Sequence, residues 1–490
     1  MRASGILLHI TSLPSPFGIG TLGREAHDFA DFLFSAGQRY WQMLPTGATS
    51  YGDSPYQSFS AFAGNPYFID LEQLREQGLL MQEELEAAFW GDDLRQVDYR
   101  AVYEARLPLL RKAFGRIDAR MQEALDTFIE EHASWLEEYA LFMALKAQFG
   151  MRAWTDWPEE LRLRKEEALS QYRALLSGEI RFFSFVQLLF FRQWDALKAH
   201  CASRGVKLIG DLPIYVAMDS ADVWANPQYF QLDEARMPLQ VAGVPPDYFS
   251  ADGQLWGNPL YDWAVMEKDG FSWWMRRIAA SAKMFDVLRI DHFRGLSSYW
   301  SVPYGDATAR NGVWRKGPGR AFVDALKINF PGFPIIAEDL GAPAEDVYAL
   351  MDYAGYPGMR VLQFAFDALS ENSYQPHTYP TRCVCYTGTH DNDTVTGWLK
   401  SGDPEAVGYA VEYFGLNAKE GLNWGFLRGG MSSVAELFIA QMQDYLGLDE
   451  VSRMNMPSTT GCNWCWRMLP GEADDALSRR IARMTRMYGR

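Results

Sequence analysis

The chain has 490 residues, 48% of them hydrophobic, and a formal net charge of −16 with a sequence pI near 5.0. This composition allows a large core, and the acidic balance argues against nucleic acid, which is bound by a basic face, and against anionic substrates. A neutral ligand fits best. Aromatic residues make up 14%, with 17 Trp, which suits both core packing and stacking against sugar rings.

The N-terminal segment and the cysteines predict a cytoplasmic protein. MRASGILLHITSLPSPFG has one early Arg and too short an apolar run for a signal peptide, and no apolar run of about 18 residues follows. Five cysteines, an odd number, predict reduced thiols, and the lone CxxC at Cys462 and Cys465 is weak evidence for zinc or redox chemistry. Without recognisable phosphate, calcium or paired-histidine motifs, we expect no cofactor, metal, nucleic-acid partner or membrane contact; the oligomeric state is open.

Eight short apolar runs end in polar residues, Gly or Pro, and lack the alternation of half-buried strands, as strands buried on both faces do. Helical periodicity lies between them, for example over 21–37 and 182–205, and again in a final helix over 471–489. Eight strands followed by helices predict a (β/α)8 TIM barrel. The predicted strands are 4–10, 39–46, 206–214, 286–293, 333–341, 358–366, 382–392 and 452–458.

Three intervals are too long for plain connections. Residues 70–181 are charged and helical and predict an inserted helical subdomain after the second strand. Residues 215–264 are rich in Pro, Gly, Asp and aromatics and predict a long irregular loop over the barrel mouth. Residues 393–450 predict a smaller insertion between strands 7 and 8. Because such insertions fall on the C-terminal face of a barrel, we expect one catalytic domain over 1–490.

Four acids end four of the predicted strands: Asp211, Asp291, Glu338 and Asp391. A single acid at a strand end is usually a turn residue or a helix cap. Four acids on one rim, without metal-binding histidines, are what glycosidic bond chemistry needs. One acid attacks the anomeric carbon, another protonates the leaving oxygen, and the others hold hydroxyl groups.

The neighbourhood of each acid predicts its role. Arg289 lies two residues before Asp291, on the same side of a strand, and its charge should lower the pKa of that carboxyl and keep it ionised. Glu338, on the adjacent strand, should hold a proton as general acid, roughly 5–5.5 Å from its partner. Asp339 should point the other way as a polar wall contact, and His292 should face away because neighbouring strand residues alternate.

Four motifs resemble the bacterial 4-α-glucanotransferases, or amylomaltases, of glycoside hydrolase family 77, in the same order and over essentially the whole chain. The resemblance implies a barrel, a retaining mechanism without a cofactor, and α-1,4-glucans and glucose as partners. It also implies Asp291 as nucleophile, Glu338 as general acid/base and Asp391 as transition-state stabiliser. The motifs are RIDHFRG (289–295), IIAEDLG (335–341), GTHDNDT (388–394) and GDSPYQSFSAFAGNPYFIDL (52–71).

The same resemblance implies a set of substrate contacts. A lone histidine such as His390 is usually a core residue, and here the resemblance favours the site. Residues 243–261, which include Pro245, Pro246, Tyr248 and Phe249, resemble a loop over the groove. One departure is Ser458, in MPSTTG, where the family more often has Pro-Gly-Thr. The implied substrate-binding residues are Arg289, His390, Asp211, Tyr56, Trp256, Ser54 and Asn463, the last beside Trp464 in NWCWR.

Two alternative functions remain open from the residues alone. An α-1,4-glucan hydrolase of the α-amylase type would use the same acids, and only the family resemblance favours transfer. A non-catalytic glucan-binding barrel belongs to another class, and the intact pair of Asp291 and Glu338 argues against it. Replacement of Asp291 by Asn tests the second alternative, and the fate of maltotriose tests the first.

Overall fold

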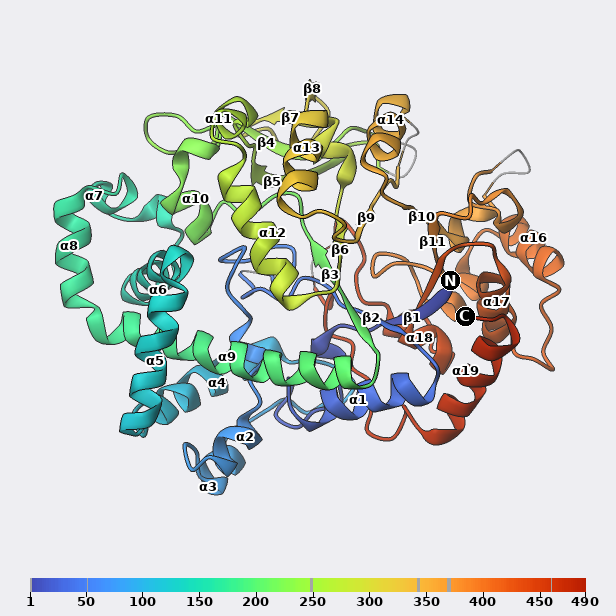
Figure 1. Cartoon of the computed structure of the whole chain (residues 1–490), viewed down its shortest axis with the longest axis horizontal. Helices are drawn as coiled ribbons and strands as arrows, with labels where there is room; N and C mark the ends of the chain where they lie inside the picture. The colour runs from blue at the N-terminus through green and yellow to red at the C-terminus, as the bar shows by residue number, and fades with distance from the viewer. Residues whose placement is uncertain (1, 51, 247–249, 342–343, 368–371, 460) are drawn as a thin grey trace.

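A closed barrel of parallel strands forms the centre of the molecule (Figure 1). The computed structural model describes residues 2–50, 52–246, 250–341, 344–367, 372–459 and 461–490. The strand order is β10-β11-β12-β1-β2-β3-β6-β9, and the N–H of Ala337 donates to the carbonyl of Pro357 at 3.0 Å, which joins the two ends of the sheet. The predicted (β/α)8 barrel is confirmed. Its strands are β1 (Ala3–Leu7), β2 (Tyr40–Gln42), β3 (Lys207–Leu212), β6 (Val287–Ile290), β9 (Ile335–Ala337), β10 (Gly358–Val361), β11 (Cys383–Tyr386) and β12 (Leu437–Gln441).

The eighth predicted strand is wrong. The run 452–458 is loop, and the strand that closes the barrel is β12, which pairs in parallel with β1 on one side and β11 on the other. Its sequence, LFIAQ, is buried from its second residue on. The range 393–450, predicted as an insertion between strands 7 and 8, therefore contains the eighth strand, and the elaboration ends before Leu437.

Helices follow most of the strands and cover the outside of the barrel (Figure 1). The longest, α9, packs on α1 and β3 on one side and on α4, α5 and α6 on the other, which explains why so much of it is buried. The helices of the described residues are α1 (Arg24–Ser35), α2 (Leu71–Glu76), α3 (Gln82–Glu86), α4 (Tyr99–Phe114), α5 (Ala119–Glu131), α6 (Ala133–Gln148), α7 (Glu159–Arg162), α8 (Glu166–Leu175), α9 (Ser177–Ser203), α10 (Ala221–Ala225), α11 (Trp263–Lys268), α12 (Ser272–Met284), α13 (Gly319–Asn329), α14 (Glu345–Ala354), α15 (Val395–Ser401), α16 (Pro404–Phe414), α17 (Leu422–Ser432), α18 (Met442–Leu446) and α19 (Asp475–Met487).

Alternate residues of the barrel strands face its inside and its outside. On β6, Val287 belongs to the cluster that fills the barrel, whereas Leu288 and Ile290 belong to the larger core beneath the helices. The same alternation turns Arg289 inward, opposite Asp211 of β3 and two residues beyond the apolar pair of Val287 and Ile209. Polar side chains at the upper ends of the strands thus lie directly above an apolar filling.

The predicted insertions differ in character. Residues 70–181 hold α2 to α8 and the first residues of α9, at the left and bottom of Figure 1. Residues 215–264 are not an irregular loop alone: they contain β4 (Gln240–Val244) and β5 (Gln254–Pro259). These pair antiparallel with β7 (Ser298–Pro303) and β8 (Val313–Lys316) in a second sheet, β5-β4-β7-β8, whose later strands the sequence patterns did not predict.

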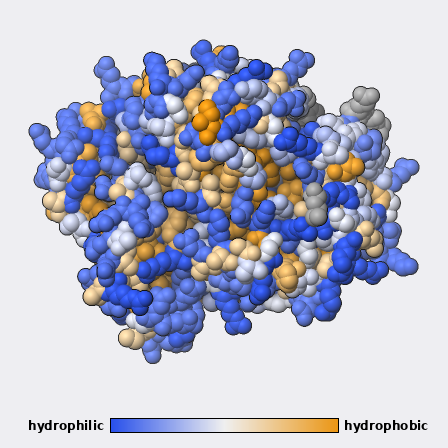
Figure 2. All heavy atoms as spheres, viewed as in Figure 1, coloured by the Kyte–Doolittle hydropathy of each residue, from blue (hydrophilic) through white to orange (hydrophobic). Residues whose placement is uncertain are grey.

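The surface agrees with the acidic, polar composition. In Figure 2 hydrophilic side chains cover the margin of the visible face, and hydrophobic residues show mainly in its middle. Within the described residues no single helix is long and apolar enough to cross a membrane; α8 and α9 together would qualify by length and composition alone, with a bend of 77° between them.

Candidate active site

Three acids converge on one arginine at the C-terminal mouth of the barrel. Arg289 of β6 lies opposite Asp211 of β3 in the strand register, and its Nη1 is 2.6 Å from a carboxylate oxygen of Asp211. The same nitrogen is 3.1 Å from Asp291, and Nη2 is 3.1 Å from Glu338. The side chains of Arg289 and Asp211 are 3% and 0% exposed. Burial of such charges is tolerated only when they are paired, so the arginine holds the site together.

Asp291 and Glu338 are in hydrogen-bonding contact with each other. The strands that carry them are neighbours, as predicted, since Ile290 pairs with Ala337 just before the two acids. The predicted separation of roughly 5–5.5 Å is the one that leaves room for a reacting sugar carbon. Three carboxylates around one guanidinium leave an excess of negative charge, and a proton shared between two of them relieves it.

The pKa values of the two acids shift in the directions opposite to those predicted. Burial and the charge of Glu338 raise the pKa of Asp291 well above its ordinary value, and the nearby Arg289 does not offset them. Burial would raise the pKa of Glu338 as well, but the charge of Arg289 and hydrogen bonds from Asp291 and the backbone lower it. The geometry gives the reason: Glu338 accepts the N–H of His292 at 2.6 Å and has Nη2 to itself, whereas Asp291 shares Nη1 with Asp211.

His292 faces the cleft, contrary to prediction. The strand β6 ends at Ile290, and His292 takes a left-handed backbone conformation with φ of 49°, so the strand alternation no longer applies. Its ring meets Trp256 edge-to-face with centroids 4.8 Å apart. Burial lowers the pKa of His292 to about 4, which keeps its ring neutral beside Glu338. Asp339 does point away as predicted: it accepts the N–H of Met359 at 2.7 Å, across the closing edge of the barrel.

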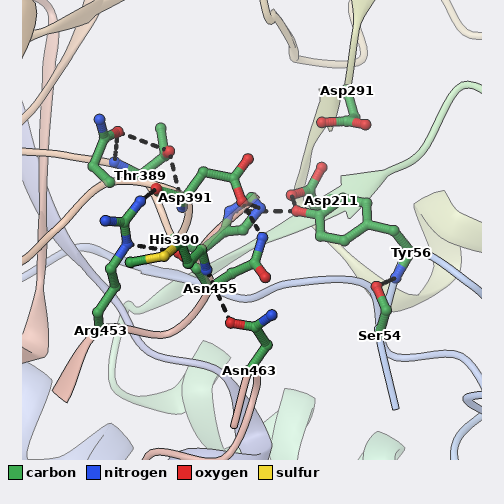
Figure 3. Close-up of polar contacts among 12 residues, drawn as sticks. Ser54, Tyr56, Asp211, Asp291, Thr389, His390, Asp391, Arg453, Asn455 and Asn463 are labelled. Carbon is green, nitrogen blue, oxygen red and sulfur yellow. Dashed lines mark hydrogen bonds and ion pairs between the residues drawn. The ribbon is translucent and has the colours of Figure 1, made fainter. Parts of the chain in front are cut away.

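Asp391 and His390 lie on the loop after β11, on the other side of the cleft (Figure 3). Asp391 is 46% exposed, the most open of the acids, and its carboxylate is 3.3 Å from Nε2 of His390. Asn455 donates a hydrogen bond to that carboxylate at 2.6 Å, and the guanidinium of Arg453 binds the backbone carbonyl of Asp391. The sequence patterns did not single out Asn455 or Arg453, although both lie just before MPSTTG, the segment that holds Ser458.

Tyr56 connects the two sides of the cleft (Figure 3). Its hydroxyl donates to Asp211 at 2.7 Å, and its ring stacks on His390 with centroids 5.0 Å apart and planes at 21°. Trp464 lies 5.9 Å from Tyr56 and 5.7 Å from His390. Burial and the charge of Asp211 raise the pKa of Tyr56 well above its ordinary value, so the phenol stays a neutral donor. An aromatic floor thus lies beside the acids, as predicted.

The cleft has a volume of about 330 Å³, at the lower end of small-ligand sites. Asp211 and Arg289 lie beneath its surface. Ser54 lines the cleft and accepts the N–H of Tyr56 at 3.3 Å. Several lining residues were missed although they lie in segments that the sequence analysis singled out: Gln57 in 52–71, and Gln254 and Asn258 in 243–261. The predicted residues that line it are Ser54, Tyr56, Trp256, Asp291, Glu338, His390 and Asp391, and the missed ones include Gln57, Tyr215, Gln254, Asn258, His292 and Asn455.

Asn463 is the one predicted contact residue that neither lines the cleft nor lies directly beneath it. Its side-chain oxygen accepts the N–H of Met456 at 3.0 Å, and its amide donates to the carbonyl of Thr459 at 3.1 Å, so it stabilises the rim loop. In that loop Ser458, at the glycine position of the related family, has a φ of 63°. The loop therefore keeps a glycine-like backbone with a serine in it, at some conformational cost.

Among the described residues, no three His, Cys, Asp or Glu side chains gather as a group that could hold a metal ion. The acids at the mouth are held by Arg289 instead. Carboxylates arranged in this way can transfer protons and stabilise positive charge, which a sugar develops at its anomeric carbon when a glycosidic bond breaks.

The whole chain is similar to known 4-alpha-glucanotransferases. The family model of that description, for glycoside hydrolase family 77, matches residues 8–472. The 4-alpha-glucanotransferase of Clostridium butyricum is 49% identical over 485 residues, which cover 99% of this chain and 100% of that protein. The 4-alpha-glucanotransferase of Thermus thermophilus is 49% identical over 494 residues, which cover 99% of this chain and 98% of that protein. The structure of an amylomaltase from Streptococcus agalactiae in complex with acarbose is 41% identical, with a TM-score of 0.98 and 100% of both chains covered. The chain belongs to glycoside hydrolase family 77, the 4-alpha-glucanotransferases.

Proposed function

We propose that this chain transfers a segment of an α-1,4-glucan to the 4-hydroxyl of an acceptor glucan or glucose by a retaining double displacement. The observation that carries the proposal is the pair of Asp291 and Glu338, which end neighbouring strands, face one cleft and both contact Arg289. Family membership favours transfer over hydrolysis. The distribution of these charges supports the order of the chemical steps.

In the first step, Asp291 attacks the anomeric carbon of the donor while Glu338 protonates the departing oxygen. The glycosidic bond breaks, a covalent glycosyl ester forms, and the shortened glucan leaves. This step needs Asp291 ionised and Glu338 protonated, which is the reverse of the pKa shifts of the two acids in the structure. Entry of the sugar between the two carboxyls separates them and moves their shared proton to Glu338.

In the second step, an acceptor 4-hydroxyl attacks the ester while Glu338 removes its proton. The ester bond breaks and an α-1,4 bond forms again, so that two inversions give net retention. Asp391 and Arg289 stabilise the positive charge that develops on the sugar in both steps. Tyr56 and His390 form the stacking surface beneath the reacting sugar.

Transfer requires that an acceptor sugar reach the ester before water does. The segment 243–261 supplies a cover: β4 and β5 bring it over the mouth, and Trp256 on it packs against His292 at the cleft. Water excluded in this way favours the acceptor. Tyr248 and Phe249, predicted as part of the cover, lie outside the described residues. A shortened loop should raise the ratio of hydrolysis to transfer, and an unchanged ratio would count against this role.

Maltotriose as sole substrate separates transferase from hydrolase. A transferase releases glucose and builds a ladder of longer chains while the total of reducing ends stays constant. A hydrolase raises that total. An early rise in reducing ends equal to the glucose released would overturn the proposal.

Replacement of Asp291 by Asn separates an enzyme from a glucan-binding barrel. The variant should lose turnover while its melting temperature and its affinity for maltooligosaccharides stay close to wild type, because Asn fills the same space. Turnover equal to wild type would refute the assigned nucleophile. We further propose a cytoplasmic location, on the odd number of cysteines in the sequence.

A further inference from the structure

A buried acid outside the cleft, Asp444 of α18, ties together the two ends of the loop that carries His390 and Asp391. Its Oδ2 accepts the hydroxyl of Thr387, directly after β11, at 2.5 Å. Its Oδ1 accepts the N–H of Val395, the first residue of α15, at 2.7 Å. The segment between these two anchor points is 388–394. One carboxylate thus fixes both the entry and the exit of the loop.

Both anchor points need this acid. The N–H of Val395 is one of the donors at the start of a helix that have no partner within the helix. The cap residue Thr394 does not satisfy it, because the hydroxyl of Thr394 accepts the N–H of Gly397, at 3.0 Å. The hydroxyl of Thr387 is fully buried. Without Asp444 a buried N–H and a buried O–H would both lose their partner, which costs more than an ordinary hydrogen bond contributes.

Asp444 is itself held rigidly. It is fully buried in α18, which directly follows β12. Its backbone carbonyl accepts a hydrogen bond from the side-chain amide of Asn423, in α17, at 2.8 Å. Within the described part of the chain no lysine, arginine or histidine forms an ion pair with its carboxylate, and burial raises its pKa to about 7. A buried carboxylate without a cation is costly, which points to a role other than charge pairing.

We propose that Asp444 is a positioning residue that places Asp391 and His390 in the cleft by holding both ends of segment 388–394. This inference rests on the role proposed above for Asp391. On the cleft side the loop is held by Asn455, and Asp444 fixes the opposite side, so the carboxylate of Asp391 is set between two anchors. A displacement of about 1 Å in such a group can lower the rate by about 100-fold.

The chain offers a matched control far from this loop. Asp70 is also buried, and it also accepts one threonine hydroxyl, Thr21 at 2.8 Å, and one backbone N–H at a helix start, Gln73 at 2.9 Å. None of these control residues lines the cleft. Loss of Asp70 should therefore remove the same kinds of contact without moving Asp391.

The test compares D444A with D70A and D444N on maltotriose, with glucose release as the assay. Both alanine variants should lower the melting temperature, but only D444A should lower kcat, by about 10- to 100-fold with a smaller change in KM. D444N should regain most of the lost kcat, because its amide oxygen can accept from Val395 while its nitrogen donates to the oxygen of Thr387. Equal kcat in D444A and D70A would overturn the inference.

Should D444A fail to fold, the pair T387V and T21V replaces the alanine variants, since each removes one hydroxyl and keeps the shape of the side chain. T387V should then lower kcat and T21V should not; equal kcat values would overturn the inference. D391N is measured in parallel. If D391N is inactive while D444A or T387V keeps the wild-type kcat, only the positioning role of Asp444 is refuted. If D391N is fully active, the role proposed for Asp391 itself is refuted.

Discussion

Asp291 and Glu338 both bind the guanidinium of Arg289, yet their pKa values shift in opposite directions. Burial and the charge of Glu338 raise the pKa of Asp291, while a guanidinium nitrogen and a backbone N–H stabilise Glu338 as an anion. In the proposed mechanism the substrate therefore does more than occupy the site. A sugar between the two carboxyls leaves Asp291 ionised as the nucleophile and Glu338 protonated as the acid.

The first prediction concerns E338Q with an α-maltotriosyl fluoride, a donor whose leaving group needs no proton. The variant should still release fluoride, because Asp291 remains. Removal of the Glu338 charge lowers the pKa of Asp291, so the low-pH limit of fluoride release should move to lower pH than in the wild type. A fluoride electrode measures the rate of fluoride release and its dependence on pH. The control is D291N, which should release no fluoride. An unchanged low-pH limit would show that the two carboxyls do not interact.

The second prediction concerns R289M, which removes the cation that Asp211, Asp291 and Glu338 share. The variant should be inactive and less stable by about 3–5 kcal/mol at pH 8. Uncompensated carboxylates have raised pKa values in the folded state, so the loss of stability should be present above those values and shrink as the pH falls and the acids gain protons. Urea unfolding at pH 8 and pH 5 checks this sign; an equal loss at both would contradict it.

The barrel and its acids could be predicted from sequence because buried parallel strands leave a direct pattern: apolar runs that end where polar side chains emerge. Asp211, Asp291 and Glu338 follow three such runs, and each lies at the mouth. The strand β12 was missed because only four residues, none of them Gly or Pro, separate it from the glycine-rich helix α17. No local property of LFIAQ distinguishes a strand from the end of a helix.

The remaining misses depend on contacts that no local pattern contains. His292 turns into the cleft because β6 stops at Ile290, three residues before the predicted end at 293, and the backbone becomes left-handed. The opposite pKa shifts of Asp291 and Glu338 depend on which guanidinium nitrogen each acid contacts, which the sequence does not contain. Asn455 lies 64 residues from its partner Asp391, so only the folded chain shows that the two are neighbours.

The third prediction concerns N455A. Loss of the hydrogen bond to the carboxylate of Asp391, 2.6 Å long in the structure, should lower kcat on maltotriose by about 10-fold or more, since a hydrogen bond to a charged group contributes about 1.5–3 kcal/mol. Asn455 is partly exposed, so the melting temperature should change little. N455D is the companion variant: a second carboxylate against Asp391 should lower kcat further at pH 8 than at pH 5. Wild-type kcat in N455A would exclude a role in placing Asp391.

The last prediction concerns the stability of D444N as a function of pH. Burial, and to a lesser degree the charge of Asp393, raise the pKa of Asp444 to about 7 in the folded protein, from an ordinary value of 3.8. The folded state therefore holds a proton that the unfolded state has lost, and stability falls as the pH rises from about 4 to about 7, by about 4 kcal/mol at most. D444N carries no such charge. Relative to wild type, D444N should gain stability as the pH rises to 8 and lose that gain near pH 4. Urea unfolding of the two proteins at both pH values measures the difference. A difference that stays constant with pH would show that Asp444 does not titrate in this range.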